Sequence, residues 1–499
     1  MKSLWHLANL NHPYPILDHD THADVVVIGA GITGLSTALR LAEEGLSVVI
    51  LESGTVAGGS TGGSTGNLYS TLSAGLVPVR EKWGDDVLRE VVEARREALD
   101  EIERTVTRLG NDCDFHRRPL YRVAASPADD ATLSNLNREK EAHQAAGLET
   151  GPLDARLGTI TLQNGFKIAD QAQFNPLRYT QALADAATAR GVRIFEYSRA
   201  EQIEWKGTRV ECERGAVRTD QVVHASHTPK GINLTQTAMT ASLEYGTAVE
   251  VSRDTGADGI FWITNDQCSI RNYHHEGADY LIAVGEKHKT GEPVHDDNCN
   301  ERLFQYLRRH FPGASSVPTH RWSAQQFSAP DGLPWIGPSP VAPNQYIATG
   351  FGADGLVWGV LAGGIISDAI VGKENRWAER FSSRRFTLAK SARGWGEENL
   401  HVGKHMLHDH LGKTPDDDGL DDLPAGCGRV VRRDGDKVAV YRDENGALSA
   451  VSAICPHMKC VVHWNDTSKT WDCPCHGSRF GVGGEVLDGP ACQPLRPHE

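Results

Sequence analysis

Near its C-terminus the chain reads Cys455-Pro-His457 and, after a spacer, Cys473-Pro-Cys475-His476. These C-x-H and C-x-x-H pairs offer two thiolates and two imidazoles. This donor set fits a 2Fe-2S cluster in which two cysteines bind one iron and two histidines bind the other; neutral histidine then raises the reduction potential. Mixed Cys/His pairs also form closed tetrahedral zinc sites, so zinc is the alternative reading of the same residues.

The residues around these pairs resemble Rieske iron-sulfur proteins over roughly residues 425–499. Gly477-Ser478 follows the second pair as in that family, where the serine hydroxyl donates to a cluster sulfur. Gly489-Pro-Ala491 resembles the loop that covers the cluster. The resemblance implies the cluster ligands Cys455, His457, Cys473 and His476, and a clamping disulfide between Cys460 and Cys475.

Two positions depart from the Rieske pattern. Phe480 stands where high-potential members carry a tyrosine, so one potential-raising hydrogen bond should be missing, and Cys492 stands where proline is common. A Rieske cluster carries one electron at a time and performs no bond chemistry alone. Another part of the chain must therefore supply or use these electrons.

A dinucleotide-binding fingerprint opens the chain after an N-terminal arm, residues 1–22. Residues 23–28 form an apolar strand pattern, Gly29-Ala-Gly31-Ile-Thr-Gly34 follows at once, and a helical pattern and a second strand lead to Glu52. In such a unit the first glycine makes the turn, the second admits the pyrophosphate, and the third lets helix and strand pack closely. The helix N-terminus then faces the phosphates and Glu52 can accept from the ribose hydroxyls.

A second loop of glycines and hydroxyl residues, 58–67, follows and favours FAD over NAD, because its backbone amides suit the length of a flavin. The alternative reading of this loop is a flexible linker. A later G-x-G-x-x-G, residues 350–355, opens a helix, but residues 372–385 are too polar to complete an NAD site. We interpret that helix N-terminus as closing on the same flavin. The predicted FAD-binding residues are Gly29, Gly31, Ile32, Thr33, Gly34, Glu52, Ser53, Gly59, Ser60, Thr61, Gly66, Asn67, Gly350, Gly352, Asp354, Gly355 and Leu356.

Together with Asp331-Gly-Leu-Pro-Trp-Ile-Gly337, these motifs resemble the glycine, sarcosine and D-amino-acid oxidase family over residues 23–372. With the C-terminal domain, the chain resembles bacterial fusions of an FAD-dependent oxidoreductase to a Rieske domain. The resemblance implies FAD and oxidation of a C–H bond beside an amine nitrogen.

The predicted fold is an α/β FAD-binding Rossmann-like domain with an interleaved antiparallel-sheet substrate domain, plus a small all-β Rieske domain. We assign residues 23–240 and 326–375 to the FAD domain, which carries helical insertions. Residues 241–325, with short alternating strands, form the substrate domain. Residues 376–424 are a linker and 425–499 the Rieske domain.

Candidate substrate contacts lie in and beside the alternating strands. Arg271 could pair with a substrate carboxylate through its planar fork, and Tyr245 and Tyr273 could line the pocket. Each could equally be an ordinary wall or surface residue. His227 could approach the flavin or cap its turn.

Histidines 401, 405, 408 and 410 cluster in the linker. Glu398 with His401 and His405 is faintly similar to a two-His, one-carboxylate iron site. Whether this cluster binds metal is left open by the sequence.

The composition and charge of the chain limit the kinds of partner that the protein can bind. A net charge of −14 argues against nucleic acid or anionic membrane as a partner. The N-terminus shows no secretory signal, and the apolar segment 356–366 is interrupted by glycines and too short to span a bilayer. These two features predict a soluble, cytoplasmic protein. The other six of the ten cysteines are scattered and are interpreted as reduced thiols.

Three functions fit these features. The first is an amine or amino-acid dehydrogenase that sends electrons through the cluster to an external carrier. The second is a dioxygen-using amine oxidase with a structural cluster. The third is an electron-transfer or reductase component for a partner oxygenase, with an external protein as electron donor.

Overall fold

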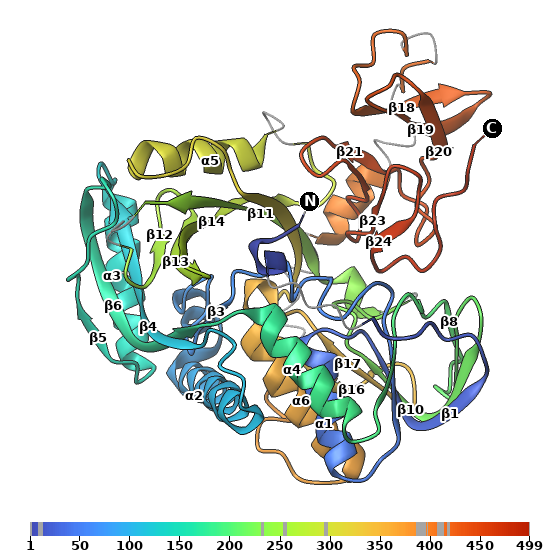
Figure 1. Ribbon diagram of the computed structural model, residues 1–499, viewed down its shortest axis with the longest axis horizontal. Helices are drawn as coiled ribbons and strands as arrows, with labels where there is room; N and C mark the ends of the chain where they lie inside the picture. Colours follow the sequence, from blue (N-terminus) through green and yellow to red (C-terminus); the bar gives the residue numbers. More distant parts are fainter. Residues whose placement is uncertain are drawn as a thin grey trace.

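The structure is a computed structural model that describes residues 2–7, 13–230, 234–252, 257–293, 298–385, 396, 398–406, 414–416 and 420–498. Figure 1 shows a lower body that contains the strands β1 and β10 with the helices α1, α4 and α6. A curved antiparallel sheet lies above it, and the C-terminal domain, in orange and red, sits beside that sheet. The predicted fold class is confirmed.

The first sheet has the order β16-β17-β10-β1-β2-β7, with β8 and β9 attached to β10. Its central strand β1 pairs in parallel with both β2 and β10. The run Val25 to Ile28 is buried, as expected of a parallel strand covered on both faces. The strands are β1 Thr21–Ile28, β2 Val48–Leu51, β7 Arg193–Phe195, β8 Gln202–Ile203, β9 Arg209–Glu211, β10 Ala216–His224, β16 Trp335–Pro338 and β17 Gln345–Thr349.

Two helices, α1 (Ile32–Glu43) and α6 (Gly355–Val371), pack closely in this domain. A Cβ at Gly359 would lie 2.6 Å from Thr33 Oγ1, and one at Gly363 would lie 2.9 Å from Ser36 Cβ, so two small residues permit the approach. The segment Gly352–Val371 is apolar enough to cross a membrane by composition, and 67% of its apolar window is buried inside the protein. The other helices are α2 Val77–Leu109, α3 Asp130–Ala145, α4 Pro176–Thr188 and α5 Cys299–His310, with 3₁₀ turns at Leu4–Leu7, Leu234–Thr237 and Gly352–Asp354.

The second sheet has the order β15-β11-β14-β13-β12-β4-β6-β3, with β5 beside β6. Its strands are β3 Asn67–Leu68, β4 His116–Ala125, β5 Thr150–Pro152, β6 Leu162–Gln173, β11 Thr240–Val251, β12 Ile260–Ile263, β13 Cys268–His275, β14 Ala278–Lys289 and β15 His320–Ser328. The sheet therefore draws strands from well before residue 241. β12 pairs in parallel with β4, with Ile260 opposite Leu120, and this pairing joins the strands that precede residue 241 to those that follow it.

The Rieske domain consists of a three-stranded sheet, β18-β19-β20, and a four-stranded sheet, β21-β22-β23-β24. Trp471 is buried between Trp464 and Phe480, which lie on the neighbouring strands β21 and β23. The strands are β18 Cys427–Arg433, β19 Asp436–Arg442, β20 Leu448–Ser452, β21 His463–Asn465, β22 Thr470–Asp472, β23 Arg479–Phe480 and β24 Val486–Asp488. All pairings within the two sheets are antiparallel, as predicted for a small all-β domain.

Two buried histidines, remote from the cluster ligands, are held neutral. His143 lies between the Glu139 carbonyl oxygen (2.6 Å) and Thr71 Oγ1 (2.8 Å). His224 lies between the Gln345 Oε1 atom (2.9 Å) and the backbone N–H of Lys230 (3.4 Å). Burial is the main cause that lowers their pKa values, to about 3 for His143 and about 4 for His224.

Acid should therefore destabilise the fold. A histidine with a lowered folded-state pKa contributes its full stability above the unfolded pKa of about 6.5, and this contribution falls as the pH drops toward the folded pKa, by up to about 1.4 kcal/mol per pH unit and group. We expect the thermal midpoint to fall between about pH 7.5 and pH 5, and to fall less in His143→Gln. The exposed His19→Gln variant is the control. A midpoint independent of pH over this range would contradict the assignment.

Candidate flavin and cluster sites

The main cavity lies at the carboxyl end of β1 and is lined by both glycine-rich loops, by the start of α6 and by the Rieske segment Leu487 to Gly489. Gly29 has φ +107°, a conformation that favours glycine, and makes the turn from β1 into α1. A Cβ at Gly34 would collide with the carbonyl oxygen of Gly29, so only glycine allows α1 to lie this close to β1. The fingerprint therefore has the shape that a pyrophosphate requires.

Glu52 is held in place by the backbone. Its Oε2 accepts from the Ala30 N–H (2.8 Å) and its Oε1 from the Gly54 N–H (2.7 Å). The side chain lines the cavity at the end of β2, where the ribose of a dinucleotide lies in this fold.

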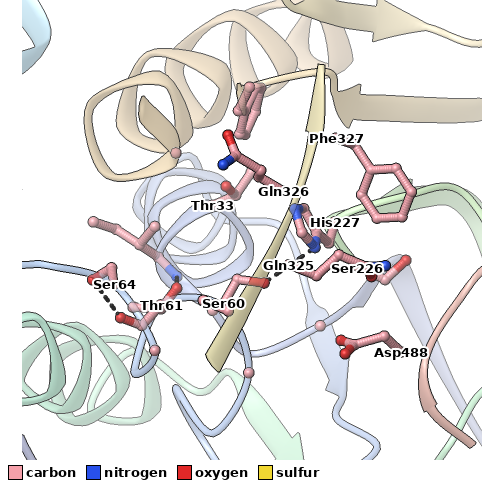
Figure 2. A pocket seen from close by; sticks show the side chains of 18 of the residues that line it. Thr33, Ser60, Thr61, Ser64, Ser226, His227, Gln325, Gln326, Phe327 and Asp488 are labelled. Carbon is pink, nitrogen blue, oxygen red and sulfur yellow. Dashed lines mark hydrogen bonds between the residues drawn. The ribbon is translucent and has the colours of Figure 1, made fainter. Parts of the chain in front are cut away.

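The second glycine loop is ordered by contacts rather than being a flexible linker. Thr61 Oγ1 accepts from the backbone N–H of Ile32 (3.2 Å), the first residue of α1. The N-terminal arm reinforces the loop, because Trp5 is buried and its Nε1 donates to the Ser64 carbonyl (2.7 Å). Figure 2 shows Ser60, Thr61 and Ser64 on one wall of the cavity.

Most predicted FAD-binding residues line this cavity, namely Gly29, Gly31, Ile32, Thr33, Glu52, Ser53, Gly59, Ser60, Thr61, Asn67, Gly352, Gly355 and Leu356. Four others lie behind its wall. Gly34 packs on Gly29, Gly66 accepts from Arg271 (2.9 Å), and Gly350 packs on Ala329. Asp354 forms a buried ion pair with Arg95 (3.2 Å), which ties the start of α6 to α2.

The predicted substrate residues divide into two groups. Tyr245 lines the cavity, and its hydroxyl accepts from Asn465 of the Rieske domain (3.0 Å). Arg271 is buried behind the second glycine loop, with its guanidinium 5.0 Å from the centre of the Trp5 ring. Tyr273 donates to Asp114 (2.6 Å) on that far side. Neither Arg271 nor Tyr273 is among the cavity-lining residues.

Further cavity residues were not evident from local motifs. Glu244, Gln325, Phe351 and Lys230 line it. They come from separate strands and loops without a common spacing. Alternation along β11 and β15 indicated a sheet, yet only the pairing of these strands shows which side chains share the cavity.

The four predicted cluster ligands converge in the Rieske domain. Cys455 and Cys473 are buried free thiols, and the rings of His457 and His476 lie 5.1 Å apart. The two thiols contact each other: hydrogen bonding with Cys473 lowers the pKa of the Cys455 thiol, and the same contact raises the pKa of the Cys473 thiol. Cys460 and Cys475 form the disulfide that the resemblance implied.

The unused imidazole atoms identify the donors. His457 Nε2 lies 3.1 Å from Gln236 Oε1, which leaves Nδ1 for iron. His476 Nδ1 is a buried nitrogen without a hydrogen-bond partner in the described part of the chain. Two buried thiols and two Nδ1 atoms fit a cluster ligated by two cysteines and two histidines.

Contacts continue from the cluster loop to the flavin cavity. Gln325, which lines the cavity, donates from Nε2 to the carbonyl oxygen of Gly477 (2.7 Å), the residue after ligand His476. The Phe327 ring lies 4.8 Å from the ring of His227, and His227 Nδ1 lies 3.1 Å from Ser60 Oγ in the flavin loop. Figure 2 shows Gln325, Phe327, His227 and Ser60 around this part of the cavity, with Asp488 of the Rieske domain nearby.

The linker histidines lie beside the antiparallel sheet. Glu398 pairs with Lys289 (3.0 Å), whereas His401 and His405 both approach Glu292 (3.2 Å each). His408 and His410 lie outside the described residues.

The fold and these two sites define a flavin-dependent oxidoreductase with its own iron-sulfur domain. Residues 24–369 match the model of the FAD dependent oxidoreductase family, and residues 417–499 match the Rieske [2Fe-2S] domain. The chain belongs to the FAD dependent oxidoreductase family, carries a C-terminal Rieske domain, and uses FAD and a Rieske 2Fe-2S cluster as cofactors.

Relatives share this organisation in whole or in part. The chain is 31% identical to a putative Rieske 2Fe-2S iron-sulfur protein, YhfW, of Bacillus subtilis (strain 168), over 99% of this chain and 97% of that protein. It is 26% identical to gamma-glutamylputrescine oxidoreductase of Escherichia coli (strain K12), over 75% of this chain and 89% of that protein. Glycine oxidase from Geobacillus kaustophilus shares the fold at 18% identity, with a TM-score of 0.59 over 73% of this chain and 99% of that one.

Replacing Gly34 by alanine should abolish FAD binding. The added methyl would meet backbone rather than a movable side chain, so α1 must shift away from β1 and the phosphate-facing turn must open. We expect the purified Gly34→Ala protein to lose most of its flavin absorbance. Gly364→Ala, in α6 with Arg40 Cζ 3.9 Å away as the nearest atom, is the control and should keep its flavin. Full flavin content in Gly34→Ala would refute this account of the turn.

Proposed function

We propose that the protein oxidises an amine or amino acid at the C–H bond beside nitrogen and passes the electrons through its Rieske cluster to an external acceptor. When bound, FAD accepts a hydride, that is two electrons, whereas the 2Fe-2S cluster carries electrons one at a time. The substrate is released as an imine, which water can hydrolyse. The names of the amine- and amino-acid-oxidising relatives support this substrate class.

The contact between Gln325 and Gly477 carries the proposal. It joins a side chain of the flavin cavity to the residue that follows a cluster ligand, with a hydrogen bond of 2.7 Å. His227 and Phe327 fill the space beside it, both of them buried or nearly so. The protein thus supports electron exchange between its two cofactors within one chain.

Hydrogen bonds to Gly291 and Tyr245 fix the Rieske domain against the sheet that contains β11 and β14. The Gly291 carbonyl accepts from His463 Nδ1 (2.7 Å), and the Tyr245 hydroxyl accepts from Asn465 Nδ2 (3.0 Å). Met458, next to the predicted ligand His457, is exposed to solvent. An acceptor protein could therefore approach the cluster from solvent.

Glu244 is the residue we assign to the substrate amine. It lines both the flavin cavity and an adjoining pocket whose wall includes Trp262, Phe351 and Lys287. Burial raises the pKa of the Glu244 carboxyl, which Lys287 partly opposes. A carboxylate in such a place has few water partners and gains from an ammonium ion, since charge-assisted hydrogen bonds are roughly twice as strong as neutral ones.

The alternative functions fit the contacts less well. A cluster that served structure alone would not require a polar bridge to the flavin cavity. A pure reductase component would not require the second pocket beside the cavity. We therefore favour the dehydrogenase over the dioxygen-using oxidase and over the reductase component.

Anaerobic reduction tests the electron path. Amines and N-methyl amino acids are screened without oxygen while flavin absorbance and the paramagnetic signal of the reduced cluster are recorded. We expect an active compound to bleach the flavin and then reduce the cluster. In Gln325→Glu the new carboxylate faces the Gly477 carbonyl, so the rate of cluster reduction relative to that of flavin bleaching should fall by about tenfold or more, an effect of roughly 1.4 kcal/mol. The exposed Gln144→Glu variant is the control.

Each alternative has its own outcome in this experiment. Rapid peroxide formation in air that persists at the same rate in His457→Ala would favour the oxidase. Failure of every amine to bleach the flavin, with reduction of both cofactors by a donor protein, would favour the reductase.

The Glu244→Gln variant tests the proposed contact between Glu244 and the substrate amine. Loss of the charge should raise KM for the active amine about tenfold, since one charge-assisted hydrogen bond contributes about 1.5–3 kcal/mol, while Glu250→Gln on the solvent side of the same strand should leave KM unchanged. Because the carboxylate attracts ammonium and the acid form does not, KM in the wild type should fall as the pH rises through the raised pKa of Glu244. That pH dependence should be absent from Glu244→Gln. Equal KM profiles for both proteins would remove Glu244 from the site.

A further inference from the structure

A second cluster of metal-binding side chains lies outside both cofactor sites. His401 and His405 stand one helical turn apart on the helical segment 398–406. Their rings lie 4.6 Å apart and both face Glu292, in the loop that follows β14. We propose that Glu292, His401 and His405 bind one divalent transition-metal ion of the zinc type, which fastens the linker helix to the antiparallel-sheet domain.

The spacing of the donor atoms supports an ion. His401 Nε2 and His405 Nε2 each lie 3.2 Å from the same oxygen, Glu292 Oε1. Zinc bonds of about 2.0–2.1 Å to nitrogen and oxygen in a tetrahedron place neighbouring donors roughly 3.3–3.4 Å apart. The two distances from Glu292 Oε1 to the histidine nitrogens are therefore already close to the separation that donor atoms have around a bound zinc ion.

Hydrogen bonding does not account for the whole cluster. His405 Nε2 has the geometry of a hydrogen bond to Glu292 Oε1 (3.2 Å). His401 Nε2 lies at the same distance, yet it is a buried nitrogen without a hydrogen-bond partner among the described residues. A metal ion would satisfy this nitrogen, because a ligand lone pair points to the ion rather than to the carboxylate.

Glu398, the acidic residue nearest to these histidines in sequence, is engaged elsewhere. Its Oε2 accepts from Lys289 Nζ and from Thr240 Oγ1, both at 3.0 Å. These contacts dock the start of the helix on β11 and β14. The carboxylate that completes the proposed site therefore comes from the sheet domain, and the ion would join two separate parts of the chain.

The site lies next to the support of the cluster loop. Glu292 follows Gly291, whose carbonyl accepts from His463 of the Rieske domain (2.7 Å). A Cβ at Gly291 would lie 2.5 Å from the backbone nitrogen of Pro474, between Cys473 and Cys475. An ion on Glu292 would thus stiffen the turn on which the cluster loop rests, and three protein donors leave a fourth position for water.

Metal analysis of the full-length holoprotein tests the site. The protein is incubated with Zn²⁺ and passed through a desalting column, and zinc, iron and FAD are then quantified. We expect one zinc per chain beside a full complement of cluster iron, and at least a tenfold weaker zinc affinity in His401→Ala and Glu292→Ala. His274→Ala, which removes an exposed histidine 2.8 Å from Asp279, is the matched control and should retain zinc.

The iron and flavin contents separate this test from folding defects and from zinc in the cluster site. Unchanged iron and FAD in the variants, with zinc lost, supports the proposal whether or not the proposed amine-oxidising activity is found. Absence of retained zinc in the wild type, or equal retention in all four proteins, overturns it. As a second measure, a chelator should lower the thermal midpoint of zinc-loaded wild type by several degrees and leave that of His401→Ala unchanged.

Discussion

The contact of the cluster loop with the flavin domain is the constraint on which the organisation of this protein depends. Gly477 has φ +77°, and a Cβ there would collide with Ala241 and lie 2.8 Å from Gln325 Nε2. Only glycine can therefore lie at this point with its carbonyl on Gln325. A residue with a side chain would separate the histidine-ligated end of the cluster from the flavin cavity. The close approach of the cluster loop to the flavin cavity thus rests on one missing methyl group.

Glycines also permit close backbone contacts inside the flavin domain. Gly34 lets α1 rest on the β1 turn, and Gly359 with Gly363 lets α6 approach α1. Close backbone packing places the start of both helices around one cavity, so residues of both G-x-G-x-x-G motifs line it. Asp354 lies at the second of these and is neutralised by Arg95, which explains how a carboxylate is accommodated at a buried helix start.

The antiparallel sheet adds the substrate side. It combines β11 to β15 with β3 to β6, which lie between residues 67 and 173, and the pairing of β12 with β4 holds the two groups together. Glu244 faces the cavity from this sheet, whereas Arg271 is turned toward Trp5 behind the glycine loop. The sheet thus decides which of its polar side chains line the cavity, and Tyr245 marks where it meets the Rieske domain.

The sequence by itself determined the fold class and both cofactors, and it predicted the four cluster ligands and the main phosphate-facing turn. These features depend on residues a few positions apart, whose geometry is set by covalent spacing and local backbone conformation. Only the tertiary structure decided that Glu292 rather than Glu398 meets His401 and His405, that Arg271 lies behind the cavity wall, and that Gln325 touches the cluster loop. Those contacts join residues far apart in the chain, and strand register and packing, which no local spacing encodes, bring them together.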